Sequence, residues 1–83
     1  MKATVRVINK KRGMYAAEIE GTGEFVVFEL LDSYEPEIGD VISHHDFFRM
    51  GGETYKNLTQ GCDFDVAVEN VCGPNLVRQQ CFL

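Results

Sequence analysis

Short apolar runs alternate with polar, glycine-bearing turns over the first 31 residues of the chain. The pattern predicts three strands, at residues 3–9, 14–20 and 24–31, joined by turns at residues 10–13 and 21–23. Short strands joined by such tight turns pair with their neighbours as an antiparallel meander. We expect the rest of the fold to be organised around this meander.

Alternation within the second and third strands assigns each of them an inward face. The residues expected in the core are Tyr15, Ala17, Ile19, Val26, Phe28 and Leu30. The outward faces are also partly apolar, through Met14, Phe25, Val27 and Leu31. A sheet with apolar residues on both faces is either covered by another part of the chain or forms a binding surface, and both alternatives are open at this stage.

The second half of the chain predicts further strands. Residues 41–44 follow a turn containing Pro36 and form a fourth strand, while residues 47–50 and 54–56 form a small hairpin about two glycines. Residues 62–71 alternate most clearly. Their inward-facing side chains are Cys62, Phe64, Val66 and Val68.

The last segment, residues 75–83, is either a short strand or a loose turn of helix. Its apolar residues suggest that it docks on the rest of the protein; they are Leu76, Val77, Phe82 and Leu83. Five to seven short antiparallel strands with almost no helical periodicity predict an all-β fold. We therefore expect residues 1–83 to form a single domain, a small closed or partly closed antiparallel β-barrel, because closure removes exposed strand edges.

Charge is spread unevenly along the chain, whose net charge is −5. All the basic residues of the first twelve positions, including Lys10, Lys11 and Arg12, precede the first acidic residue. An acidic body argues against broad, non-specific polyanion binding. The basic turn at residues 10–12 is therefore either a solvated loop tip or a local phosphate contact.

The sequence favours a soluble cytoplasmic protein with no membrane association. No apolar run approaches the roughly 20 residues that span a bilayer, and the first residues lack the apolar core of a signal peptide. The three cysteines, Cys62, Cys72 and Cys81, are odd in number and fit reduced thiols better than a disulfide framework.

No pattern of residues predicts an active site, a metal site or a cofactor. His44 and His45 are adjacent, and neighbouring residues of a strand point to opposite faces, so we do not expect them to share a metal. One exposed and one half-buried histidine is the expected arrangement. The carboxylates lie along outer strand faces, where they form a solvated surface and not an acid/base pair. We expect the protein not to be an enzyme.

The order of several motifs resembles the cold-shock domain, a five-stranded OB barrel. Residues 5–13 are similar to its first strand and the Lys-Gly start of its second, and residues 25–28 to its third. Residues 56–61 and 64–68 resemble its Lys-Ser-Leu-x-x-Gly turn and fourth strand. A second alignment makes residues 38–45 the fourth strand of an ordinary OB barrel and residues 62–71 the fifth, and both alignments are open at this point.

The departures from that family concern binding. The resemblance implies recognition of single strands by bases stacked on exposed aromatic side chains, each worth about 1–3 kcal/mol. The family's aromatic and histidine positions are occupied here by Val7, Met14, Ala16 and Val27, while Phe25 and Phe28 keep theirs. The fold can be inherited without the family's mode of binding.

Two functions follow as hypotheses. The first is a non-enzymatic OB-type module that contacts single-stranded RNA or DNA through the basic turn, with other residues nearby. Its predicted binding residues are Arg6, Lys10, Lys11, Arg12, Tyr15 and Phe25. The second is a protein-interaction module, a homodimer among the options, that uses the apolar outer face formed by Met14, Phe25, Val27 and Leu31.

Overall fold

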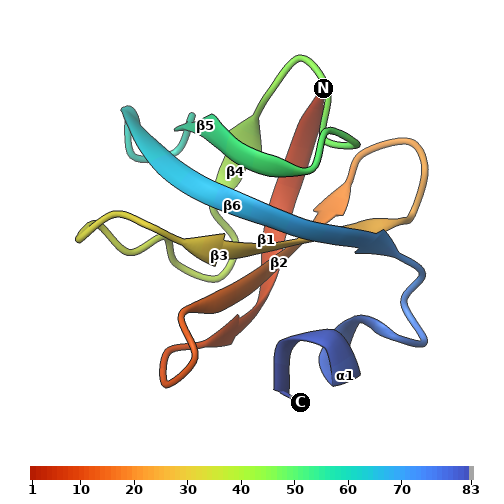
Figure 1. Ribbon diagram of the computed structural model, residues 1–83. Coiled ribbons are helices and arrows are strands. Elements are labelled where there is room, and N and C mark those ends of the chain that lie inside the picture. Colours follow the sequence, from red (N-terminus) through yellow and green to blue (C-terminus); the bar gives the residue numbers. More distant parts are fainter. Residues whose placement is uncertain (83) are drawn as a thin grey trace.

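The first three strands pair as an antiparallel meander, as the sequence predicts. The computed structural model describes residues 1–82 (Figure 1). The strands are β1 (Lys2–Asn9), β2 (Met14–Ile19), β3 (Phe25–Leu30), β4 (Val41–Ser43), β5 (Gly51–Asn57) and β6 (Cys62–Cys72), and a helix, α1 (Val77–Phe82), follows them. The six strands close into an antiparallel barrel in the order β1-β2-β3-β6-β5-β4, which confirms the predicted small all-β barrel.

Strand β6 decides between the two alignments. It pairs with β3 on one side and with β5 on the other, and the helix α1 follows it. The assignment of residues 64–68 to the fourth of five strands is therefore wrong, because they belong to β6, the last strand of the barrel. Strand β4 pairs with β1, so residues 41–43 take the place that the second alignment gives them.

The predicted hairpin over residues 47–50 and 54–56 is wrong. Phe47 is fully buried at the end of the barrel, and the Asp46 carboxylate accepts the Phe48 N–H at 2.9 Å, which bends the chain into a turn. Gly51 adopts a φ of +85°, and β5 begins there, paired with Val68 of β6. The two glycines thus open a strand that pairs across to β6.

Aromatic side chains fill the centre of the barrel around Phe28. The ring centroid of Phe28 lies 5.8 Å from that of Tyr15, 5.3 Å from that of Tyr55 and 6.1 Å from that of Phe64. All four rings are buried. Phe64 and the neighbouring inward residues of β6 confirm the alternation predicted for residues 62–71, with Asp63 and Asp65 exposed.

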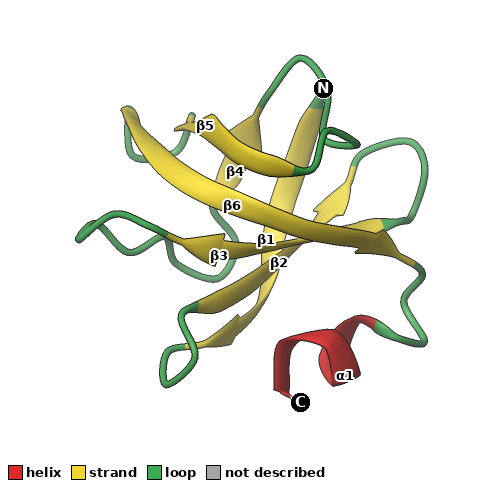
Figure 2. Ribbon diagram, viewed as in Figure 1, coloured by secondary structure: helices red, strands yellow, loops and turns green. Residues whose placement is uncertain are grey.

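Helix α1 covers the outer face of the meander. Gly73 and Pro74 end β6, and the chain then turns back so that Val77 and Cys81 pack on β1, β2 and β3 (Figure 2). The face that they cover is formed by Val7, Met14, Ala16, Val27 and Cys72. The meander is therefore apolar on both faces because one face lines the barrel core and α1 covers the other.

The docking prediction for residues 75–83 is correct, and Val77 packs as expected, but Cys81 packs in place of Leu76 and Phe82. Val77 and Cys81 are buried, whereas Leu76 and Phe82 are 50% and 47% exposed. Leu83 lies outside the described residues. Within residues 1–82, no helix has the length and apolar character needed to cross a bilayer.

Candidate nucleic-acid interface

The turn between β1 and β2 presents three consecutive cations at one end of the barrel. Lys10, Lys11 and Arg12 are exposed, and backbone hydrogen bonds from Arg12 N to Asn9 O and from Gly13 N to Lys10 O close the turn at 3.3 Å each. Gly13 has a φ of +64°, a conformation that side-chain-bearing residues rarely adopt. The local backbone therefore holds the three cations on a tight tip.

An exposed carboxylate holds Lys10 only loosely. Lys10 Nζ lies 3.8 Å from Glu35 Oε2, and both side chains are more than half exposed. Earlier in β1, Arg6 Nε lies 3.3 Å from Glu18 Oε1, also at the surface. Surface ion pairs contribute about 0–1 kcal/mol, so a phosphate group can replace either carboxylate at little cost.

The C-terminal end of α1 meets this turn. The carbonyl oxygen of Cys81 accepts hydrogen bonds from Asn9 Nδ2 at 3.0 Å and Arg12 Nη1 at 3.5 Å. Burial raises the pKa of the Cys81 thiol, as does nearby Cys72, while the charges of Arg12 and Arg78 act in the opposite direction. Arg12 thus contacts the end of α1, and Arg78, three residues before Cys81 in the same helix, adds a fourth cation at this end of the barrel.

Phe82 supplies an exposed aromatic ring at the same place. The Arg78 guanidinium lies 5.4 Å from the centroid of the Phe82 ring, and Phe82 is 47% exposed. Figure 1 shows the β1–β2 turn and α1 together at the bottom of the view. We call this surface the basic end, and it consists of Lys10, Lys11, Arg12, Arg78 and Phe82.

Tyr15, one of the two aromatic rings of the predicted nucleic-acid site, is not accessible to a base. Tyr15 is 1% exposed, because its ring points into the barrel and stacks on Phe28, so no base can reach it. Phe25 is half-buried against the cluster under α1. The structure thus brings Lys10, Lys11 and Arg12 to one surface, without either of these rings.

The apolar patch of the protein-interaction hypothesis is not available as a surface. Met14 is 7% exposed and Val27 1%, because α1 packs over both. Phe25 is half-buried under the same helix, and Leu31, at 58%, is exposed just beyond the end of β3. The four residues therefore do not form one exposed face.

Arg78 and Phe82 were not among the binding residues predicted from the sequence, although their spacing indicates that they can lie side by side. They are four residues apart, and a helix places such residues next to each other on one face. The prediction for residues 75–83 left helix and strand open, so this spacing carried no weight there. The spacing becomes informative once α1 is known to be helical.

A cavity of about 590 Å³ opens beside Lys10. We call it the Tyr34 pocket. Its main lining residues are Ile8, Lys10, Tyr34, Pro36, Ile38 and Gln60. Glu35 and Glu37 also line it. Lys10 thus belongs both to the basic end and to the wall of this cavity.

A buried polar network supports the wall of the Tyr34 pocket. Asp40 Oδ2 accepts three hydrogen bonds, from Glu37 N at 2.9 Å, Asn57 Nδ2 at 2.8 Å and Gln60 Nε2 at 2.7 Å. Asn57, which is fully buried, also donates to the Tyr34 hydroxyl at 2.6 Å. The network joins the loop before β4 to the β5–β6 turn.

Asp40 is therefore expected to make stability depend on pH. Burial alone raises the pKa of Asp40, but the three hydrogen bonds outweigh burial and hold the pKa below its ordinary value of 3.8. Its contribution is complete above that value and is lost as the pH falls through the lower pKa of the folded state. Asp40→Asn should lower the free energy of unfolding by about 1–3 kcal/mol at neutral pH.

The measurement is urea unfolding of both proteins between neutral pH and pH 2. The difference between them should shrink only below the ordinary carboxyl value. A difference that disappears already near neutral pH would show that Asp40 is not the group responsible. Glu20→Gln, an exposed substitution outside the network, serves as the control.

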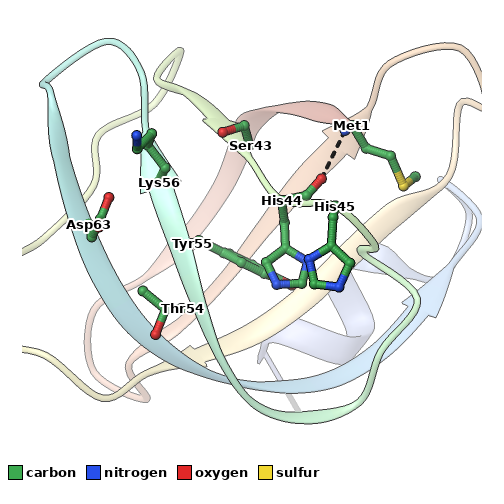
Figure 3. A pocket seen from close by; sticks show the side chains of 8 residues that line it. All are labelled: Met1, Ser43, His44, His45, Thr54, Tyr55, Lys56 and Asp63. Atoms are coloured by element: carbon green, nitrogen blue, oxygen red, sulfur yellow. Dashed lines mark hydrogen bonds between the residues drawn. The ribbon is translucent and has the colours of Figure 1, made fainter.

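A second cavity, of about 450 Å³, is lined by His44, His45, Lys56 and Asp63 among others (Figure 3). His44 Nδ1 lies 3.0 Å from both the backbone nitrogen and the carbonyl oxygen of Asp46, and its Nε2 lies 2.9 Å from Glu53 Oε1. Both ring nitrogens are therefore engaged in holding the loop after β4. This arrangement indicates a structural role for His44.

The two histidine rings lie on the same side of the chain, with centroids 4.4 Å apart. The prediction that they point to opposite faces is wrong, because β4 ends at Ser43 and strand alternation stops there. The expected burial is confirmed, since His45 is exposed and His44 half-buried. Within residues 1–82, no three His, Cys, Asp or Glu side chains are grouped to hold a metal.

No protein-family model, curated protein or solved structure matches this chain. The likeness to the cold-shock domain therefore stays a resemblance in the order of short motifs.

Proposed function

We propose that this chain is a non-enzymatic OB-type module that binds single-stranded RNA or DNA at the basic end. The observation that supports this proposal is the contact between the β1–β2 turn, which carries three exposed cations, and the end of α1, which carries exposed Arg78 beside the exposed ring of Phe82. Proteins that bind single strands combine cations that follow the phosphates with aromatic rings on which bases stack.

Each part of the basic end has a role in this proposal. Lys10, Lys11 and Arg12 neutralise successive phosphates, and one base stacks on the face of Phe82 that Arg78 leaves free. The covered meander takes no part, because α1 occupies the position where a strand would otherwise lie.

The acidic remainder of the barrel limits the length of strand that is bound. The outer face of β6 carries Asp63, Asp65 and Glu69, all exposed, which repel phosphate. With few phosphate contacts, the affinity depends moderately on salt, at about 0.7 in log–log slope per phosphate. We therefore expect a short footprint and binding that is strongest at low ionic strength.

The test is fluorescence anisotropy with short labelled RNA and DNA strands over a range of salt concentrations. The double variant Lys10→Ala/Lys11→Ala should lose affinity for all sequences alike, and its salt slope should fall by roughly 1.4 for two lost phosphate contacts. The matched control is Lys56→Ala. Lys56 in β5 pairs with Ser43 in β4, and Ser43 pairs with Lys2 in β1. Lys2 is at the opposite end of β1 from Lys10, so Lys56 lies away from the basic end.

The control should bind as the unmodified protein does. Failure of the unmodified protein to titrate either RNA or DNA at micromolar concentration and low salt would overturn the proposed function. Equal losses in the control and the double variant would instead place the contact surface elsewhere on the barrel.

A further inference from the structure

We propose that the Tyr34 pocket receives one base of the bound strand and prefers a base with an exocyclic amino group, such as adenine, cytosine or guanine, over uracil or thymine. This inference rests on the proposed function and deepens it. It adds a preference for particular bases to a surface, the basic end, whose cations contact phosphates of any sequence. The pocket and the basic end share Lys10, so a strand whose phosphate contacts Lys10 has a base within reach of the cavity.

The size and walls of the cavity suit a planar base. Its volume of about 590 Å³ lies in the range of about 300–1,000 Å³ that is usual for small-ligand pockets. Ile8, Pro36 and Ile38 supply apolar surface, and Tyr34 supplies an aromatic ring. Bases of single strands are typically held by such aromatic contacts together with hydrogen bonds to their polar edges.

The Tyr34 ring is held in place before any ligand arrives. Its hydroxyl accepts a hydrogen bond from Asn57 Nδ2 at 2.6 Å, and its ring lies 5.6 Å from that of Phe64 in the core. Burial is the main cause that raises the pKa of Tyr34, so the wall of the pocket carries a neutral hydroxyl at ordinary pH, while the Asn57 hydrogen bond to its oxygen acts in the opposite direction. A preorganised wall reduces the ordering cost of binding.

The polar groups of the pocket are mostly hydrogen-bond acceptors. Gln60 Nε2 donates to Asp40 Oδ2, an acceptor-only oxygen, so the Gln60 amide must turn its nitrogen toward Asp40. Its carbonyl oxygen is then the acceptor that Gln60 offers to a ligand. Glu37 adds a carboxylate, which accepts hydrogen bonds only.

An acceptor-rich pocket distinguishes bases by their amino groups. Adenine and cytosine each carry an exocyclic amino group that donates two hydrogens, and carboxylates are known partners of the cytosine amino group. Uracil and thymine present two carbonyl oxygens on either side of a single N–H, and these oxygens would face the carboxylate. The pocket therefore favours the amino-bearing bases by attraction and disfavours the others by repulsion.

The test compares labelled oligo(A), oligo(C) and oligo(U) of equal length by anisotropy at one low salt concentration. We expect oligo(A) or oligo(C) to bind at least fivefold more tightly than oligo(U). Glu37→Gln should reduce this ratio to less than twofold. Ile38→Ala removes apolar surface from the pocket at a position that is 60% exposed, so folding is preserved, and it should weaken binding of oligo(A) and oligo(C) more than that of oligo(U).

Glu20→Gln is the matched control, because it changes the net charge as Glu37→Gln does. Glu20 lies at the far end of the barrel, where its N–H donates to Lys2 O. The control should leave the ratio unchanged. Equal affinity for all three strands, unaffected by Glu37→Gln, would overturn the proposal that the pocket selects a base and would leave the proposed function standing. No binding of any strand would overturn the proposed function itself.

Discussion

Phe28→Ala is expected to lower the free energy of unfolding by about 3–5 kcal/mol, the usual cost of truncating a buried phenylalanine. Phe28 is fully buried and its ring contacts those of Tyr15, Tyr55 and Phe64, which come from three other strands. The cavity left behind would face all three rings. Small domains are stable by only about 5–15 kcal/mol, so much of this margin would be lost.

Urea unfolding followed by circular dichroism measures this effect. Phe48→Ala is the matched control, since the Phe48 side chain is 45% exposed and should change stability by less than about 1 kcal/mol. Equal effects of the two substitutions on the free energy of unfolding would contradict the arrangement of the core, because Phe28, and not Phe48, contacts the rings of the core.

Val77→Asp is expected to detach α1 from the barrel. Val77 is 4% exposed and packs on the meander, where a carboxylate would lack a partner. A six-residue helix does not hold its structure alone, because isolated helices of that length are marginal in water. The barrel should stay folded while its covered face, including Met14 and Val27, becomes exposed.

Two measurements follow α1 in the Val77→Asp variant. Amide hydrogen exchange should lose protection at residues 77–82 but keep it in β6, and sedimentation should show self-association through the newly exposed face. Gln79→Asp, at an exposed position of the same helix, is the control and should remain as the unmodified protein. A monomeric Val77→Asp protein with α1 still protected would contradict the role of this helix as a cover.

The strands were predictable because alternation is a local signal. The run at residues 62–71 has one apolar inward row and one acidic outward row, and the barrel buries Phe64, Val66 and Val68 as expected. The cover on the meander was not predictable in the same way. Its partner, α1, lies some fifty residues further along the chain and buries only Val77 and Cys81, too few for a clear helical period.

The proposed binding surface was partly predictable for similar reasons. The cations at Lys10 to Arg12 lie on a glycine-bearing turn, and turn tips are exposed in almost any β fold. Tyr15 was assigned both to the inward face of β2 and to the binding surface, and burial in the barrel excludes the second assignment. Phe82 became a candidate only when the fold brought α1 next to the turn.

A single strand is expected to bind at the basic end. It is not expected to bind on the meander or in the cavity lined by His44 and His45. A ¹H–¹⁵N spectrum of the labelled protein, recorded while an unlabelled adenine- or cytosine-containing strand is added, tests this claim directly. The signals of Lys11, Gly13, Arg78 and Phe82 should shift, while those of Thr54 and Asp63 should not. Shifts confined to Thr54 and Asp63, or none at all at saturating strand, would contradict the claim.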